Sequence, residues 1–348
     1  MKVNGAPEGG HVPPGVDAVC IGETMAVLVP EQPGPLEESE VFRRGVGGAE
    51  SNVACGLAAL GVPTAWISRV GADGFGRLIL TQLAQRGVIT SAVEVDPRRP
   101  TGLYVKEIAR DHSSRLHYYR SDSAASALAP ESLKTPEAAT LLDDARLVHL
   151  TGITAALGYR AGHEGGRRLV ESVFDRRRPG QLVSFDLNWR PRLWDGAENG
   201  RPASILAELA NRADIVFIGT DEAEAVFATN DPEHLRALLP GPRVLVVKDS
   251  GHRVTAFEDE DVITEPALAV EVVEPIGAGD AFAAGYLAGL LRGYDQRRRL
   301  RLGHVCAASV LMVAGDHGAP PKSAELDALL GCSQAQWSEI RAARGAFA

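Results

Sequence analysis

Four short apolar segments, separated by stretches of helical character, constrain the fold of this chain more than any other feature. They are residues 147–150, 182–186, 215–218 and 244–248. Short apolar segments that alternate with helices are typical of a parallel sheet covered by helices on both faces. Ligands of such sheets bind at the carboxyl ends of the strands. Functional side chains are therefore expected directly after these segments.

The residues at the ends of these segments are polar. They are Asp186, Asn188 and Arg190, then Thr220, Asp221 and Glu222, then Lys248 and Asp249. Asn188 and Arg190 are two positions apart, so an extended backbone directs both side chains into the same cleft. Arg190 is suited to stabilising the charge of a phosphoryl group during its transfer. Glu222, at the start of a helix, is expected to interact with the helix dipole.

A glycine-rich turn before an apolar helix is the second informative feature. Gly277, Ala278 and Gly279 leave their backbone N–H groups open to an anion such as a phosphate. Asp280 follows in the same turn, where the helix dipole is expected to keep its carboxylate ionised and able to accept a proton from a hydroxyl. The alternative is a capped buried helix, because residues 281–291 are apolar nearly all round.

Two further segments carry candidate substrate contacts. Gly47 and Gly48 precede an apolar helix, and Glu50 and Asn52 could hydrogen-bond several hydroxyls. The alternative is a tight turn followed by an N-cap.

Residues 101–108 and 115–120 alternate as a hairpin does, which places Leu116, Tyr118 and Arg120 on one face. If that face closes over a pocket, Arg120 suits a carboxylate or a phosphate. The alternative is a salt-bridged surface hairpin.

The sequence from Gly277 to Phe282, followed by Gly285 and Tyr286, resembles the C-terminal signature of the ribokinase-like (PfkB) carbohydrate kinases. Residues 71–76 resemble the N-terminal signature, in which Asp73 is expected to cap a helix. The resemblance implies an α/β fold with a central, mostly parallel sheet wrapped by helices and a small β-strand lid. It also implies ATP and Mg²⁺ as cofactors and is compatible with a monovalent cation.

Within that family the likeness is greatest to the 2-keto-3-deoxygluconate kinases. It is carried by residues 47–52, 118–120, 126–130, 151–153, 186–190 and 315–320. The likeness implies that the sugar acid contacts Gly48, Asn52, Tyr104, Tyr118, Arg120, Arg190 and Asp280. Asp316 either contacts the sugar or the nucleotide or is a simple turn residue. The likeness also implies that the nucleotide contacts Asn188, Lys248, Gly277, Ala278 and Gly279, with Asp280 and Arg190 as catalytic residues and Glu222 as an indirect metal contact.

Four residues depart from the family pattern. Gly219 stands at the Asn position of the Asn-x-x-Glu motif, and Glu274 replaces the usual Asp. Ser250 and Arg253 replace glycines near the nucleotide base, which leaves the preference for the donor nucleotide open.

The predicted activity is ATP-dependent phosphorylation of the terminal hydroxyl of 2-keto-3-deoxygluconate, giving the 6-phosphate. One alternative is a kinase for another sugar, such as fructose or ribose. The other is a sugar or nucleotide sensor that keeps the fold without activity. The P-loop, the Gly-x-Ser-x-Gly elbow, the His-Glu-x-x-His zinc motif and the Gly-x-Gly-x-x-Gly dinucleotide fingerprint are all absent from the sequence.

Composition limits the partners. The net charge of −9 argues against a nucleic-acid partner, and no apolar run is long enough for a membrane span. The four cysteines lack metal-ligand spacing, which indicates free thiols in a cytoplasmic protein. The expected partners are therefore a small sugar acid and ATP.

The chain is expected to form a disordered leader (1–16), a kinase domain (17–331) and a C-terminal appendage (332–348). Lid strands are expected within about 24–48 and 92–120. Apolar residues of the lid, such as Leu103 and Val105, are compatible with pairing to a second copy of the chain.

Overall fold

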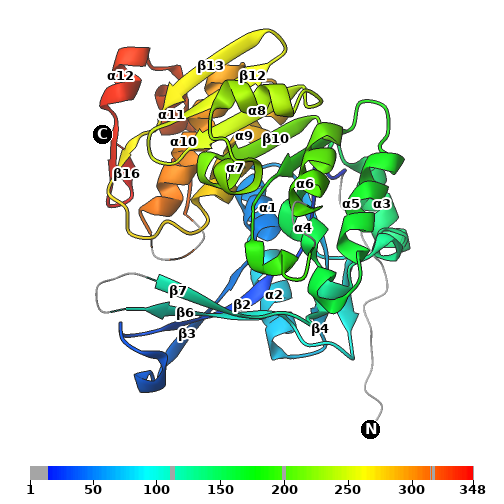
Figure 1. The fold of residues 1–348 in the computed structure, drawn as a ribbon. Coiled ribbons are helices and arrows are strands. Elements are labelled where there is room, and N and C mark those ends of the chain that lie inside the picture. The colour runs from blue at the N-terminus through cyan, green and yellow to red at the C-terminus, as the bar shows by residue number, and fades with distance from the viewer. Residues whose placement is uncertain (1–14, 110–113, 198–200, 314, 316–317, 348) are drawn as a thin grey trace.

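The computed structural model describes residues 15–109, 114–197, 201–313, 315 and 318–347. Its largest element is a sheet with the strand order β13-β12-β11-β10-β9-β8-β1-β4-β5 (Figure 1). The strands from β11 to β5 in this order are parallel, and β12 and β13 extend the sheet antiparallel at one edge. The bounds are β1 Ala18–Ile21, β4 Thr64–Gly71, β5 Val93–Asp96, β8 Leu147–Thr151, β9 Leu182–Asp186, β10 Ile215–Gly219, β11 Val244–Asp249, β12 Arg253–Glu258 and β13 Asp261–Pro266. The predicted mostly parallel sheet is confirmed.

Two apolar layers cover the faces of this sheet, because successive strand residues point to opposite sides. Ala18 and Cys20 belong to one layer, and Val19 and Ile21 belong to the other. The first layer includes residues of α1 Ala49–Ala59, α2 Gly74–Gln85, α9 Ala278–Leu291, α10 Gln296–Leu311, α11 Ser323–Gly331 and α12 Gln334–Glu339. The second includes residues of α3 Pro136–Asp144, α4 Gly152–Ala156, α5 Gly165–Arg176, α6 Arg201–Arg212, α7 Thr220–Phe227 and α8 Pro232–Leu238.

A separate four-stranded sheet, here called the lid, projects from the main body (Figure 1). Its order is β3-β2-β6-β7, with β2 Met25–Pro30, β3 Phe42–Gly47, β6 Leu103–Ile108 and β7 Ser114–Tyr119. The predicted hairpin of β6 and β7 forms, with Tyr104 opposite Tyr118. Met25, Val27 and Tyr104 are buried together on one face of the lid. Residues 93–96, by contrast, join the edge of the main sheet as β5.

Small residues bring α9 unusually close to its two neighbouring helices. A Cβ atom added to Gly285 of α9 would lie 2.5 Å from the backbone oxygen of Leu302 in α10. A Cβ added to Gly56 of α1 would lie 2.6 Å from the side chain of Ala284 in α9. Both distances are far below van der Waals contact, so α9 and its first turn are held firmly between α1 and α10.

The C-terminal segment packs onto the main domain. Trp337 of α12 is 1% exposed, and its indole N–H donates to the backbone oxygen of Pro266 at 2.9 Å. Strand β15 (Arg341–Ala343) lies between β14 (Ala269–Val270) and β16 (Ala346–Phe347) in a small sheet. Residues 332–347, expected as an appendage, therefore share the apolar layer of α9 and α10.

Two expectations concern residues that the structure does not describe. The predicted leader, residues 1–16, lies outside the described residues except for its last two positions. Asp316, expected at the sugar or the nucleotide, also lies outside them.

Candidate active site

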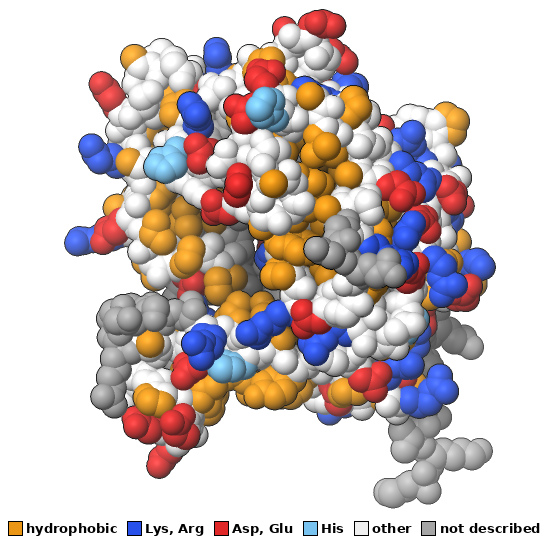
Figure 2. All heavy atoms as spheres, in the orientation of Figure 1, with side chains coloured by type: hydrophobic (Ala, Val, Ile, Leu, Met, Phe, Trp, Pro, Cys, Tyr) orange, Lys and Arg blue, Asp and Glu red, His pale blue; other side chains and the backbone are white. Residues whose placement is uncertain are grey.

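A single cleft of about 410 Å³ lies between the lid and the carboxyl edge of the main sheet, and Figure 2 shows the hollow between them. The cleft brings together nearly all of the predicted site residues. It is lined by Gly48, Asn52, Tyr104, Tyr118, Arg120, Asn188, Arg190, Glu222, Lys248, Gly277, Gly279 and Asp280. Ala278 lies within the glycine turn but does not line the cleft. Segments separated by more than 200 residues in the chain thus meet at one place.

The turn at residues 277–279, here called the glycine turn, opens α9 toward the cleft. Gly277 has φ of +83°, a left-handed conformation that favours glycine over any residue with a Cβ. The first N–H groups of an α-helix have no partner within the helix. The glycine turn therefore presents backbone donors and the positive end of the α9 dipole to an anion in the cleft.

Asp280 lies in the first turn of α9 and accepts a hydrogen bond from the side chain of Asn52 at 2.8 Å. Burial raises the pKa of Asp280 to about 7, and the hydrogen bond from Asn52 opposes this effect. Nearby Asp186 raises the pKa further, and Arg190 and Lys248 lower it. The sequence predicted that the helix dipole keeps Asp280 ionised near neutral pH, and burial opposes that effect. A pKa near the working pH suits a general base.

Asp186 was named among the polar strand ends, but sequence reasoning gave it no role in the site. It ends β9 and accepts a hydrogen bond from the ammonium group of Lys248 at 2.9 Å. Burial disfavours the charge on Lys248, but the carboxylates of Asp186 and Glu222 outweigh burial and raise the pKa of the lysine. Its place at the end of an apolar strand was visible in the sequence, but its pairing with Lys248 was not.

Glu222 accepts hydrogen bonds from the backbone at the ends of β9 and β10. One carboxylate oxygen accepts from the backbone N–H of Trp189 at 2.9 Å, and the other accepts from that of Gly219 at 3.2 Å. The same carboxylate lies 3.6 Å from the guanidinium of Arg190. Burial, followed by repulsion from Asp186, raises the pKa of Glu222. These two hydrogen bonds hold the carboxylate in place and leave further lone pairs on both oxygens.

Two oxygen atoms in the cleft fit the chemistry of a hard cation. The Oδ1 atoms of Asp186 and Asn188 are buried and have no hydrogen-bond partner among the described residues. Carboxylate and amide oxygens are ligands that Mg²⁺ accepts, directly or through water. Within the described residues, however, no group of three or more His, Cys, Asp or Glu side chains is positioned to hold a metal ion by itself.

The lid contributes a cation and two aromatic rings. Arg120 forms an ion pair with Glu23, whose side chain is fully buried. The rings of Tyr104 and Tyr118 lie 5.6 Å apart. Glu23 is a residue that sequence reasoning missed, although an acid within the apolar segment 18–29 was a visible signal.

The predicted substrate contacts in α1 and in the turn before it are only partly supported by the structure. Asn52 faces the cleft, but Glu50 is fully buried and accepts hydrogen bonds from Thr151 and Thr154, each at 2.5 Å. The proposed contact of Glu50 with substrate hydroxyls was therefore wrong. A Cβ at Gly48 would lie 2.2 Å from the backbone oxygen of Glu23, so packing as well as the cleft requires glycine there.

A contact between the lid and the main body involves one of the departures from the family pattern. Lys106 of β6 forms an ion pair with Glu274, just before the glycine turn. The longer side chain at position 274 thus reaches the lid. Ser250, another departure, has φ of +40°, a conformation that glycine would adopt with less strain.

The family model of the pfkB family carbohydrate kinases matches residues 17–322 of this chain. The chain belongs to this family. Among curated members, the 2-dehydro-3-deoxygluconokinase of Thermoproteus tenax is 35% identical over 319 residues, which cover 90% of this chain and 94% of that protein. The enzyme of the same name from Bacillus subtilis is 32% identical over 320 residues, covering 90% and 95%.

Solved structures of family members have the same fold. The PfkB protein from Polaromonas sp. JS666 has a TM-score of 0.78 and 32% identity, covering 90% of this chain and 99% of that one. An uncharacterized sugar kinase from Pyrococcus horikoshii, in complex with ATP, has a TM-score of 0.76 and 26% identity, covering 92% and 99%. The ribokinase-like fold predicted for this chain is confirmed. Among the helices that the structure describes, none has the length and apolarity to cross a membrane.

Proposed function

We propose that the protein transfers the γ-phosphoryl group of ATP to the terminal hydroxyl of 2-keto-3-deoxygluconate, giving the 6-phosphate. The observation that carries the proposal is the placement of Asp280, hydrogen-bonded to Asn52, beside the glycine turn in the cleft. The names of the Thermoproteus and Bacillus relatives, which denote 2-keto-3-deoxygluconate as the substrate, support it.

Asp280 is the proposed general base. Its carboxylate accepts the proton of the acceptor hydroxyl while the hydroxyl oxygen forms a bond to the γ-phosphorus of ATP. The bond between that phosphorus and the bridging oxygen breaks, and ADP leaves with the bonding electrons. A base whose pKa is about 7 is partly ionised at neutral pH and can also release the proton afterwards.

Negative charge on the phosphates is balanced from two sides of the cleft. The backbone N–H groups of the glycine turn bind the phosphates of the nucleotide, and Arg190 approaches from the end of β9 to contact the transferred group. Lys248 adds positive charge beneath the turn, since its ammonium group would lie 3.7 Å from a Cβ at Gly279. Asn188, held at φ of +41°, directs its amide toward the same phosphates.

The sugar acid is proposed to lie under the lid. Arg120 pairs with its carboxylate, and Tyr104 and Tyr118 border its carbon chain. Arg190 bridges the sugar acid and the transferred phosphoryl group. Gly48 and Asn52 contact its hydroxyls. Arg120 is only partly available, because Glu23 holds one side of its guanidinium. That contact orients the guanidinium before the substrate arrives.

Mg²⁺ would be held by Asp186 and Asn188 through water and would neutralise charge on the phosphates. Glu222 would contribute indirectly, by fixing the backbone that carries Asn188 and Arg190. A monovalent cation, a cytoplasmic location and pairing of two copies through the lid remain part of the proposal. The last is compatible with the 64% exposure of Tyr119 on the lid.

A coupled assay of ADP release over a panel of sugars and sugar acids tests the proposal. We expect kcat/KM to be greatest for 2-keto-3-deoxygluconate. A higher value for fructose or ribose would assign a different substrate to the same chemistry. Calorimetry that detected sugar binding with no ADP release for any member of the panel would refute the kinase assignment.

A further inference from the structure

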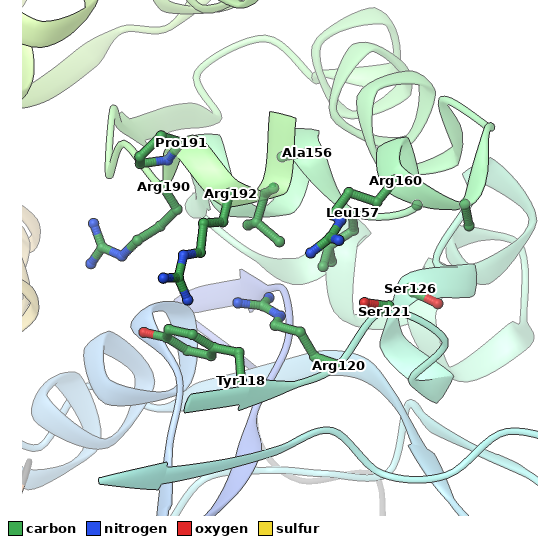
Figure 3. Close-up of a pocket in the computed structure, with 13 residues that line it drawn as sticks. Tyr118, Arg120, Ser121, Ser126, Ala156, Leu157, Arg160, Arg190, Pro191 and Arg192 are labelled. Carbon is green, nitrogen blue, oxygen red and sulfur yellow. The ribbon is translucent and has the colours of Figure 1, made fainter. Parts of the chain in front are cut away.

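A second cavity opens beside the lid end of the cleft, and four arginines line it (Figure 3). It has a volume of about 240 Å³ and shares Tyr118, Arg120 and Arg190 with the cleft. Its remaining lining includes Arg160 and Arg192, and among the described residues it includes no Asp or Glu. This cavity is here called the arginine pocket. Four cations and no acid in one lining are unexpected in a chain whose net charge is −9.

Two of the four guanidinium groups already have a nearby counter-charge outside the pocket. Arg120 pairs with buried Glu23, and Arg190 lies 3.6 Å from Glu222. These are also the two arginines that the proposed sugar site uses.

The other two arginines have a more distant counter-charge, or none among the described residues. The nearest approach of Arg160 to a carboxylate is 4.0 Å, to Asp195, and both side chains are about half exposed. Arg192 has no ion pair or side-chain hydrogen bond with any residue that the structure describes. Figure 3 shows Arg192 pointing into the gap toward Tyr118 and Arg120, and Arg160 pointing into the same gap.

The segments that carry these two arginines are fixed by aromatic packing. Arg160 lies in the 3₁₀ turn η4 (Tyr159–Ala161), and Arg192 lies in η5 (Pro191–Trp194). The rings of Tyr159 and Trp194 are 5.3 Å apart, so the two turns are packed against each other. Their guanidinium groups therefore face the pocket from a prearranged scaffold, which lowers the entropic cost of binding a ligand.

We propose that the arginine pocket is a second anion subsite, which binds the phosphate monoester of a sugar-acid phosphate whose carboxylate lies on Arg120. This inference rests on the proposed function. A carboxylate carries one charge, which Arg120 already suits, whereas a phosphate monoester carries about −1.5 to −2 and three strong acceptor oxygens. Arg160 and Arg192 supply the positive charge that balances the additional negative charge of the phosphate. Such a ligand competes with the sugar acid for Arg120 and thereby inhibits the kinase.

Calorimetry on the whole chain tests the subsite with three probes. 3-Phosphoglycerate carries a carboxylate and a phosphate monoester, glycerate lacks the phosphate, and malate carries a second carboxylate instead. We expect 3-phosphoglycerate to bind at least about 10-fold tighter than glycerate or malate, as charge-assisted hydrogen bonds do. Equal affinity for 3-phosphoglycerate and malate would overturn the assignment to a phosphate monoester.

The double variant Arg160→Gln, Arg192→Gln removes only the two cations that the proposed sugar site does not use. We expect it to bind 3-phosphoglycerate at least about 10-fold more weakly, with the affinity for glycerate unchanged. The matched control is Arg168→Gln, an exposed arginine of α5 that lines neither cavity. Unchanged binding of 3-phosphoglycerate by the double variant, or an equal loss for glycerate, would overturn the proposal.

Inhibition kinetics provide an independent measurement. We expect 3-phosphoglycerate to compete with the sugar acid, and the double variant to raise its inhibition constant about 10-fold while the KM for the sugar acid changes less than about twofold. Competition with ATP instead would place the probe at the glycine turn and overturn the proposal. Because calorimetry needs no turnover, failure of the wild type to phosphorylate the sugar acid would refute the proposed function separately.

Discussion

The hydrogen bond from Asn52 to Asp280 predicts how the pH dependence of the reaction responds to a single substitution. Asn52 is 6% exposed and donates to Asp280 at 2.8 Å, which lowers a pKa that burial has raised to about 7. Asn52→Leu keeps a side chain of similar size but removes the donor. A hydrogen bond to a charged group contributes about 1.5 to 3 kcal/mol. At 1.36 kcal/mol for each pKa step of one, the pKa of Asp280 should rise by about 1 to 2.

The sign of the effect follows from the role of the base. Asp280 acts when ionised, so activity is lost as the pH falls through its pKa, and a higher pKa moves that loss to higher pH. At pH 7 the variant should keep between about a fifth and a fiftieth of the wild-type kcat, and activity should recover above about pH 9. The assay is kcat against pH at saturating sugar acid, because Asn52 also contacts the proposed substrate.

The variant Ser51→Ala is a suitable control. Its hydroxyl bonds to the backbone of Gly48 and not to Asp280, so its pH profile should match that of the wild type. An acidic limb that stayed in place in Asn52→Leu, or moved to lower pH, would refute the assignment of that limb to Asp280.

Three further predictions test other parts of the structure. Asp280→Asn should lower kcat at least about 10²-fold without unfolding the protein, and near-normal turnover would exclude a role as base. Arg120→Lys keeps a charge beside Glu23 but loses the planar fork, so the KM for 2-keto-3-deoxygluconate should rise about 10-fold more than that for a neutral ketohexose; equal changes would argue against a carboxylate contact. Trp337→Ala should lower the free energy of unfolding by about 3 to 5 kcal/mol in urea titrations, whereas the control Trp189→Ala, at a half-buried site, should cost less.

The amino-acid pattern was sufficient to predict the sheet and most of the residues that line the cleft. Short apolar segments with polar ends can be read locally, because burial on both faces of a parallel strand requires apolar residues throughout. The end of β9 therefore pointed to Asn188 and Arg190, and the glycine turn pointed to Asp280. Their spacing in the chain did not reveal that Asp186 holds Lys248 or that Glu222 bonds to backbone groups of another strand.

Two polar residues that look alike in the sequence occupy different environments in the folded protein. Glu50 and Asn52 are two positions apart in the same helix, but Glu50 is enclosed by Thr151 and Thr154, whereas Asn52 faces Asp280. Only the packing of α1 against the sheet and α9 decides which side chain meets water, because helical neighbours point in different directions.

The sequence by itself determined the alternation of strands and helices, the position of the glycine turn and the identity of the acid beside it. Only the tertiary structure decided the protonation of that acid and the convergence of Arg160 and Arg192 on the lid end of the cleft. The reason is that strand and helix patterns depend on residues close in the chain. Loss of water and the field of distant charges, in contrast, depend on groups that only folding brings together.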